Sequence, residues 1–189
     1  LLDDPRLEPR RAATIALGHV SHADLSAVVD RLASMVSTEG DASSRHFAAI
    51  SLGRIGGPRA LKALRAALAE ASGDMRPWIA IGLGLCVRQH ADARVAADII
   101  LRLEDESNRD VREAYLIALG LCGDGQDLIP TLAHQLDASQ ADMAGKAALA
   151  LALTGQPDAQ PILRAALAHS SPVVQRQVAL GLGILGDAS

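Results

Sequence analysis

The chain has 189 residues, of which 49% are apolar and 21% are charged. This balance is typical of a protein with a hydrophobic core and excludes a disordered chain, which combines low hydrophobicity with high net charge. The 18 basic and 22 acidic residues give a net charge of −4, which disfavours a strongly basic nucleic-acid-binding protein. Phe47, Trp78 and Tyr115 are the only aromatic residues, so a binding site built on aromatic stacking would have few rings to use.

Neither end of the chain has the features of a membrane span or a secretory signal. The longest uncharged stretches reach about a dozen residues, short of the roughly 18–20 that cross a bilayer. Residues 1–5 have no basic start followed by an apolar run. We therefore expect a cytoplasmic protein. The sequence begins without methionine, and neither end carries a polar cap, so we also expect it to be part of a longer chain.

A four-residue pattern recurs six times along the chain, with leucine in its third position and a glycine, or once an alanine, in its last. The copies end at Gly18, Gly53, Gly84, Gly120, Ala152 and Gly183. These positions span 183 − 18 = 165 residues in five steps, or 33 residues per step, which is typical of stacked helical repeats. We call the last position slot 0 and count the other slots from it, so that slot −4 lies four residues earlier.

Each repeat is expected to contain two helices, helix A and then helix B. Apolar residues of helix B recur at helical spacing and occupy more than one face, as Val111, Tyr115, Leu119 and Leu121 illustrate. Helix A carries a single apolar stripe. The expected repeat units are 1–21, 22–56, 57–87, 88–123, 124–155 and 156–189. Because the first repeat unit, 1–21, holds helix B alone, the chain would contain 11 helices, or five and a half repeats.

The glycines of slot 0 lie inside helix B, where glycine costs about 1 kcal/mol relative to alanine. A close approach of stacked helices would explain why this cost recurs at one position. Three residues later, glycines are expected to end helix B in a left-handed conformation. These are Gly56, Gly123, Gly155 and Gly186.

Residues 108–120, with the sequence NRDVREAYLIALG, resemble helix B of a HEAT repeat of the short type found in phycobilisome-lyase-like proteins. The resemblance covers essentially the whole chain and implies an all-α, right-handed solenoid of stacked helical hairpins. It also implies a structural ladder in which a helix-B arginine pairs with an acid in the preceding turn. The arginines at slot −8 are Arg10, Arg45, Arg76 and Arg112, and the nearby acids are Glu8, Asp41, Asp74 and Asp110. The last two repeats have Ala144 and Gln175 in this slot.

Residues at slots −7 and −4 of helix B are expected to face the concave side of the solenoid. The candidate interaction surface comprises Arg11, Thr14, His46, Ala49, Pro77, Ala80, Glu113, Leu116, Ala148, Arg176 and Ala179. This surface is mixed in charge and has no basic stripe that could follow a phosphate backbone. Trp78 and Phe47 share slot −6, where packing between repeats is favoured and an aromatic anchor on the inner face is the alternative.

The sequence contains no recognisable catalytic motif and no convincing set of metal ligands. HEAT-like metalloenzymes such as deoxyhypusine hydroxylase use repeated His-Glu pairs as iron ligands, and none of the six histidines here precedes a glutamate. His19, His22 and Asp24 could in principle hold a metal, but histidine at a helix C-terminus is favoured by the helix dipole alone. Cys86 and Cys122 occupy one slot of consecutive B helices, about 8–10 Å apart, and are expected to be core residues without a disulfide.

These observations favour a non-catalytic scaffold that binds a protein partner, or further segments of its own chain, without a cofactor or metal. Nucleic acid and membrane are not expected as partners. Since a fold alone does not define function, the resemblance leaves a second hypothesis, a bilin-lyase-like subunit or another HEAT-type accessory subunit of an enzyme. A nucleic-acid clamp is a third hypothesis, which the net negative charge disfavours.

Overall fold

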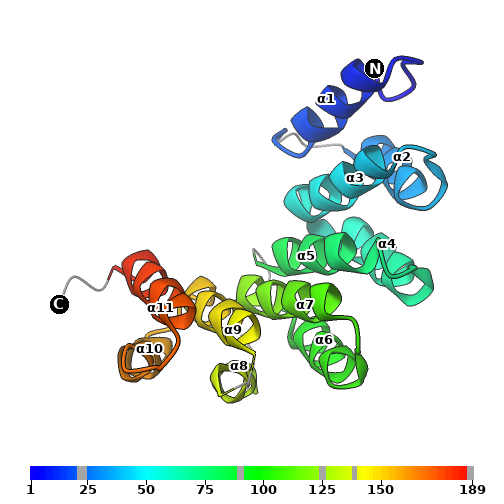
Figure 1. Cartoon of the computed structure of the whole chain (residues 1–189). Coiled ribbons are helices and arrows are strands. Elements are labelled where there is room, and N and C mark those ends of the chain that lie inside the picture. Colours follow the sequence, from blue (N-terminus) through cyan, green and yellow to red (C-terminus); the bar gives the residue numbers. More distant parts are fainter. Residues whose placement is uncertain (21–24, 89–91, 124–126, 138–139, 187–189) are drawn as a thin grey trace. The chain divides into compact units, whose positions relative to one another are not determined.

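The computed structural model describes residues 1–20, 25–88, 92–123, 127–137 and 140–186 (Figure 1). In these ranges the chain forms eleven α-helices and no strand, which confirms the all-α repeat fold expected from the sequence. The helices divide into two compact units, Leu1–His90 and Ala91–Ser189. A single continuous solenoid with the expected repeat boundaries stays a prediction. None of the described helices is long and apolar enough to cross a membrane.

The first unit contains five helices, of which α1, α3 and α5 are B helices and α2 and α4 are A helices. Their bounds are α1 Leu7–Leu17, α2 Ser26–Thr38, α3 Ala42–Ile55, α4 Gly57–Glu70 and α5 Arg76–Val87. Helix α3 packs between α1 and α5, so the three B helices form one layer. The A helices α2 and α4 pack on one another and on the B layer, as Figure 1 shows.

The second unit repeats this arrangement with three helix pairs. Their bounds are α6 Ala93–Asp105, α7 Arg109–Cys122, α8 Leu128–Leu136, α9 Ala141–Leu153, α10 Ala159–Ala166 and α11 Pro172–Ile184. Helix α9 packs between α7 and α11, and each A helix packs on the B helix that follows it. Each unit thus consists of a layer of A helices and a layer of B helices.

The helix ends follow from local sequence. The Asp41 carboxylate accepts a hydrogen bond from the backbone N–H of Ser44 at 2.8 Å and so caps the start of α3. Asn108 caps α7 in the same way, by accepting from the backbone N–H of Asp110 at 2.9 Å. Gly56, after α3, has a φ of +69°, a value that favours glycine, as expected for the end of a B helix. Its ψ of −162° differs from the left-handed helical value that the sequence suggested.

The core lies between the two layers and between consecutive B helices. Leu119, in the middle of α7, is completely buried, as predicted. The apolar stripe expected for helix A is confirmed in α2, where Val29, Leu32 and Val36 are buried. Most B helices are buried on more than one side, since α3, α5, α7, α9 and α11 each contact at least one A helix and one B helix.

The glycines of slot 0 allow B helices to approach each other closely. A Cβ placed on Gly120 would lie 2.5 Å from the carbonyl oxygen of Ala150 in α9. In the first unit, a Cβ on Gly53 of α3 would overlap the backbone of Gly82 in α5. These contacts confirm that the helices meet backbone to backbone, which explains the recurrent small residue.

Candidate functional site

The residues of slot −4 do not line an open surface, which corrects the sequence-based expectation. Thr14, Ala49, Ala80, Leu116 and Ala148 are all completely buried. Where the neighbouring B helix belongs to the same unit, this slot faces it. The Ser51 hydroxyl of α3 donates a 2.7 Å hydrogen bond to the carbonyl of Thr14 in α1, and Gly82 of α5 lies against the carbonyl of Ala49. Ala179, in α11, is the exposed member of this slot.

Apart from the buried Gly145, the residues of slot −7 are accessible, and they lie in the N-terminal halves of the B helices. Arg11, His46, Pro77 and Glu113 are partly exposed, and Arg176 is exposed. Together with the neighbouring exposed side chains of slots −6 and −10, they form what we call the helix-B face of each unit. Of the surface expected from the sequence, slot −7 and Ala179 are therefore accessible to a partner.

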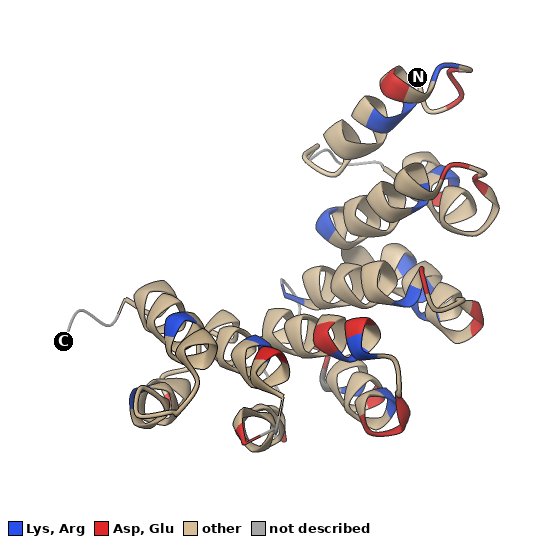
Figure 2. Ribbon diagram, viewed as in Figure 1, with Lys and Arg blue, Asp and Glu red and all other residues tan. Residues whose placement is uncertain are grey.

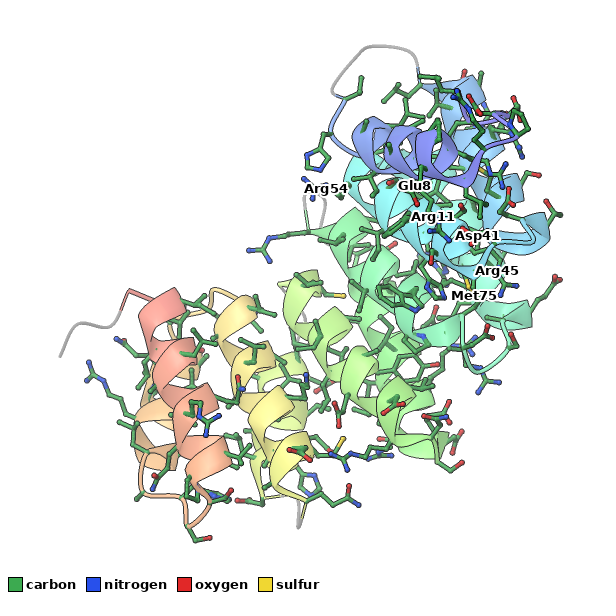
Figure 3. All side chains as sticks on the ribbon, turned by 45° about the horizontal axis from the view of Figure 1, so that its top comes forward. Glu8, Arg11, Asp41, Arg45, Arg54 and Met75 are labelled. Carbon is green, nitrogen blue, oxygen red and sulfur yellow. The ribbon has the colours of Figure 1, made fainter. Side chains whose placement is uncertain are left out.

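An ion pair between α1 and α3 organises the helix-B face of the first unit (Figure 3). The guanidinium of Arg11 donates to both carboxylate oxygens of Asp41, at 2.6 and 2.9 Å. Glu8 approaches the same guanidinium at 3.5 Å. The Arg11 guanidinium and the hydrogen bonds from Ser44 hold the pKa of the Asp41 carboxyl well below its usual range. Asp41 therefore caps the start of α3 and also pairs with Arg11 of α1.

Trp78 forms an aromatic platform with His46 on the same face. The two rings stack with centroids 4.5 Å apart and planes inclined by 14°. Through this stack Trp78 packs against the neighbouring repeat, but it keeps 38% of its surface exposed, so it is not part of the buried core, whereas Phe47 is half-buried. Burial and the Arg45 charge lower the pKa of His46, which favours the neutral imidazole at neutral pH.

In the second unit, four charged side chains from α7 and α9 form a network at the corresponding position. Arg109 pairs with Glu113 at 3.0 Å and also with Asp142, while Lys146 lies 3.9 Å from Glu113. Figure 2 shows acidic and basic residues side by side on α7. The network lines a hollow of about 270 Å³ that also includes Gly145, Val173 and Gln177. This hollow crosses three consecutive B helices, α7, α9 and α11.

The slot −8 arginines contact the turns that precede their own helices. They do so largely by donating hydrogen bonds to backbone carbonyls rather than to acidic side chains. Arg112 donates to the carbonyls of Leu103 at 2.7 Å and Glu106 at 3.0 Å. Arg76 donates to the carbonyl of Ala71 at 3.2 Å. These contacts satisfy carbonyl groups near the end of the preceding A helix.

For Arg10 and Arg45, the acidic partners differ from the expected ones. Arg10 donates to the carbonyl of Asp4 at 2.6 Å, and its carboxylate partner is Glu39, 3.4 Å away in the following repeat, rather than Glu8. Arg45 pairs at 3.3 Å with Asp74, which also lies one repeat further on. Asp41, expected to pair with Arg45, binds Arg11 instead. The acids are displaced because each turn lies beside two B helices, its own and the preceding one.

The described residues offer little for redox or metal chemistry. Burial raises the pKa of Cys86 to about 11 and that of Cys122 to about 12, and both thiols are free. No group of three potential metal ligands occurs among the residues that the structure describes. His19 lies 3.0 Å from a guanidinium nitrogen of Arg54, while its candidate co-ligands His22 and Asp24 lie outside the described ranges.

Several solved structures are similar to this chain. The complex of CpcE and CpcF of phycocyanin lyase from Nostoc sp. PCC7120 aligns with 98% of this chain and 74% of the matched chain, at 27% identity and a TM-score of 0.66. The E. coli protein YIBA aligns over 99% and 69%, at 18% identity and a TM-score of 0.61. A chain from the structure of microtubule plus-end tracking by XMAP215, CLIP-170 and EB1 aligns over 100% and 89%, at 11% identity and a TM-score of 0.55.

The sequence comparisons point to one family. A comparison with curated proteins found no match. The family model for HEAT repeats matches residues 1–84 and 129–189, which is well over half of the chain. Helix pairs with a repeated close-approach position, stacked in two layers, are the structural counterpart of that match. The chain belongs to the HEAT-repeat family.

Proposed function

We propose that the chain is a non-catalytic scaffold that binds a protein partner on the helix-B face. The observation that carries the proposal is the hollow over α7, α9 and α11, to which three consecutive helices contribute charged, apolar and amide side chains. In the first unit the exposed ring of Trp78 adds an aromatic contact, and tryptophan is among the residues that dominate protein interfaces.

The charges of this face favour a protein partner over a nucleic acid. Arg109 and Lys146 lie within ion-pair distance of Glu113 or Asp142, and Arg11 is paired with Asp41. A groove that follows a phosphate backbone needs basic groups free to replace counterions. A face of paired, alternating charges can instead select a partner through complementary hydrogen bonds and charges of both signs.

The two lysines of the chain provide a matched test. Lys146 lies on the helix-B face, and Lys62 is exposed on the A helix α4. Affinity capture from source-cell lysate with wild type, Lys146→Glu and Lys62→Glu would compare the same charge reversal on the two layers. We expect a protein held by wild type and Lys62→Glu and lost by Lys146→Glu, with the helical circular dichroism of all three unchanged. Equal capture by all three would contradict the proposed surface.

A buried position is unsuitable for this test. Leu116 was expected on the interaction surface but is completely buried, so a charge there would unfold α7 rather than report on binding. Trp78→Ala is the better second variant, because its side chain is partly exposed and its removal would test the first unit separately.

A second candidate function, an accessory subunit of a lyase, is favoured by the likeness to the phycocyanin lyase complex. Co-expression of the chain with a bilin would test it. A coloured product whose absorbance co-purifies with the chain would favour the accessory subunit, and a colourless product would favour the scaffold.

A further inference from the structure

Each unit has a hollow beside a slot −8 arginine, at the edge where A helices end and B helices begin. In the first unit, Arg45 of α3 and Met75 of α5 line a hollow of about 190 Å³ (Figure 3). In the second unit, Arg112 of α7 and Met143 of α9 line a hollow of about 430 Å³, which we call the Arg112 hollow. Both methionines occupy slot −9 of the B helix that follows the arginine. The two hollows are therefore equivalent positions of the repeat.

The two hollows differ in how the arginine is paired. The guanidinium of Arg45 lies 3.3 Å from the carboxylate of Asp74, which occupies slot −10 of α5. Helix α9 also has an acid in slot −10, Asp142, but this acid pairs with Arg109 of α7. Slot −11, which holds Arg109 in α7, holds Ala42 in α3. The additional arginine of α7 therefore pairs with the acid that the slot −8 arginine would otherwise meet.

Arg112 consequently has no acidic partner among the residues that the structure describes. Its Nη1 donates to the backbone carbonyls of Leu103 and Glu106, at 2.7 and 3.0 Å. The Glu106 carboxylate also lines the hollow, but it accepts from the backbone N–H of Asn108 at 2.9 Å rather than from Arg112. A guanidinium presents five N–H donors in a planar fork that matches a carboxylate. The charge and the remaining donors of Arg112 therefore favour a carboxylate as ligand.

The other groups around Arg112 fit a peptide that carries this carboxylate. Gln135, near the end of α8, and Gln140, just before α9, both line the hollow, together with Ser107. The Gln140 side chain makes no capping hydrogen bond to α9. A side-chain amide both donates and accepts hydrogen bonds, as the backbone of an extended peptide requires. Met143 adds flexible apolar surface for an aliphatic side chain.

The Arg112 hollow also adjoins the helix-B face. Arg109 lines both this hollow and the hollow of about 270 Å³ over α7, α9 and α11. A partner bound on the helix-B face of the second unit would therefore reach the Arg112 hollow by extending past one side chain.

We propose that the Arg112 hollow binds the carboxylate of a glutamate in an extended segment of the protein partner. This inference rests on the proposed scaffold function and adds to it the chemistry of the partner. The Arg112 guanidinium binds the carboxylate, and the two glutamine amides bind the backbone on either side of it.

Titration of the full chain with defined peptides, followed by NMR, tests the proposal. The probe is the amidated, N-acetylated peptide Ala-Leu-Glu-Leu-Ala, and its control has glutamine in place of glutamate. We expect the glutamate peptide to shift the amide signals of Arg112, Gln135 and Gln140 and to bind at least tenfold more tightly than the glutamine peptide. Acetate should bind at least tenfold more weakly than the glutamate peptide. Equal affinity for the two peptides would overturn the proposal, and equal affinity for acetate would contradict a site for peptide.

Matched variants locate the site. Arg112→Gln should abolish the preference for the glutamate peptide, whereas Arg45→Gln, the same change in the equivalent slot of the first unit, should retain it. Arg109→Ala should weaken binding at least tenfold, because Asp142 is then free to pair with Arg112, and adding Asp142→Asn should restore it. A preference that survives Arg112→Gln would overturn the proposal. So would a loss in Arg109→Ala that Asp142→Asn does not reverse while the helical circular dichroism is unchanged.

The titration is separate from the test of the proposed function. Capture that is lost in Lys146→Glu, from a chain that shows no preference for the glutamate peptide, would overturn this inference and leave the scaffold supported. Binding of the glutamate peptide at Arg112, with equal capture by wild type, Lys146→Glu and Lys62→Glu, would contradict the proposed surface and support the carboxylate site.

Discussion

Gly120 and Gly183 occupy the same slot of two B helices, and the structure predicts opposite effects for the same substitution. In Gly120→Ala, the new methyl group would lie 2.5 Å from the carbonyl oxygen and 2.7 Å from the Cα of Ala150. Both are backbone atoms that cannot rotate aside. Around Gly183, no described atom lies within 4 Å of that position. Gly183→Ala is therefore the matched control.

The magnitudes follow from two opposing effects. Alanine gains about 1 kcal/mol over glycine inside a helix. Overpacking costs about 1–3 kcal/mol, and backbone contacts at 2.5 Å place Gly120→Ala near the upper end. We expect Gly120→Ala to lose about 2 kcal/mol of unfolding free energy, a fall in Tm of roughly 4–8 °C for a chain of this size. Gly183→Ala should gain up to about 1 kcal/mol, because it keeps the helical benefit alone.

Thermal and urea unfolding followed by far-UV circular dichroism would measure both changes. They should be made at a protein concentration where the chain has the mass of a monomer, so that association does not contribute. An equal or higher stability for Gly120→Ala would refute the argument that slot 0 is small because the helices touch there.

Three further predictions concern the core, a helix cap and the thiols. Leu119→Ala should cost about 2–5 kcal/mol and Leu119→Asp should unfold α7 and its neighbours, so an unchanged Tm would show that the core assignment is wrong. The native pKa of Asp41 lies below its usual 3.8, so its stabilisation is complete above that value and declines as the pH falls below about 4. Asp41→Ala should cost about 0.5–2 kcal/mol at neutral pH and weaken that acid dependence, and an identical pH profile would contradict the role of Asp41. Cys86 and Cys122 should resist an aromatic disulfide reagent at pH 8 until the chain unfolds, and rapid native labelling would contradict their burial.

The fold could be predicted from the sequence because each weak local signal recurs in every repeat. Leucine in the third position and a small residue in slot 0 recur in register, so one interpretation had to satisfy six segments at once. The close approach of helices at Gly120 followed from the cost of glycine in a helix. The recurring pattern is periodic and the cost of glycine is local, so both can be read from a single sequence.

The interaction surface could be predicted only in part, because it depends on how neighbouring helices are rotated about their axes. Slots −7 and −4 lie on one side of helix B, yet the next B helix covers Ala49 and Ala148 and leaves Glu113 partly open. The stack of His46 on Trp78 and the pairing of Arg11 with Asp41 join residues about one repeat apart. Their spacing of about 30 residues suggested a shared register but could not tell which acid or ring each residue would meet.

The scaffold account is tested most directly by amine labelling of Lys62 and Lys146 in source-cell lysate, compared with the purified chain. Lys146 lines the hollow on the helix-B face, and Lys62 lies exposed on α4. Mass spectrometry reports the modified fraction of each lysine in the same sample, so Lys62 serves as the internal control. The account predicts that lysate protects Lys146 and leaves the labelling of Lys62 unchanged. Labelling of Lys146 that is as complete in lysate as in the purified chain would contradict it.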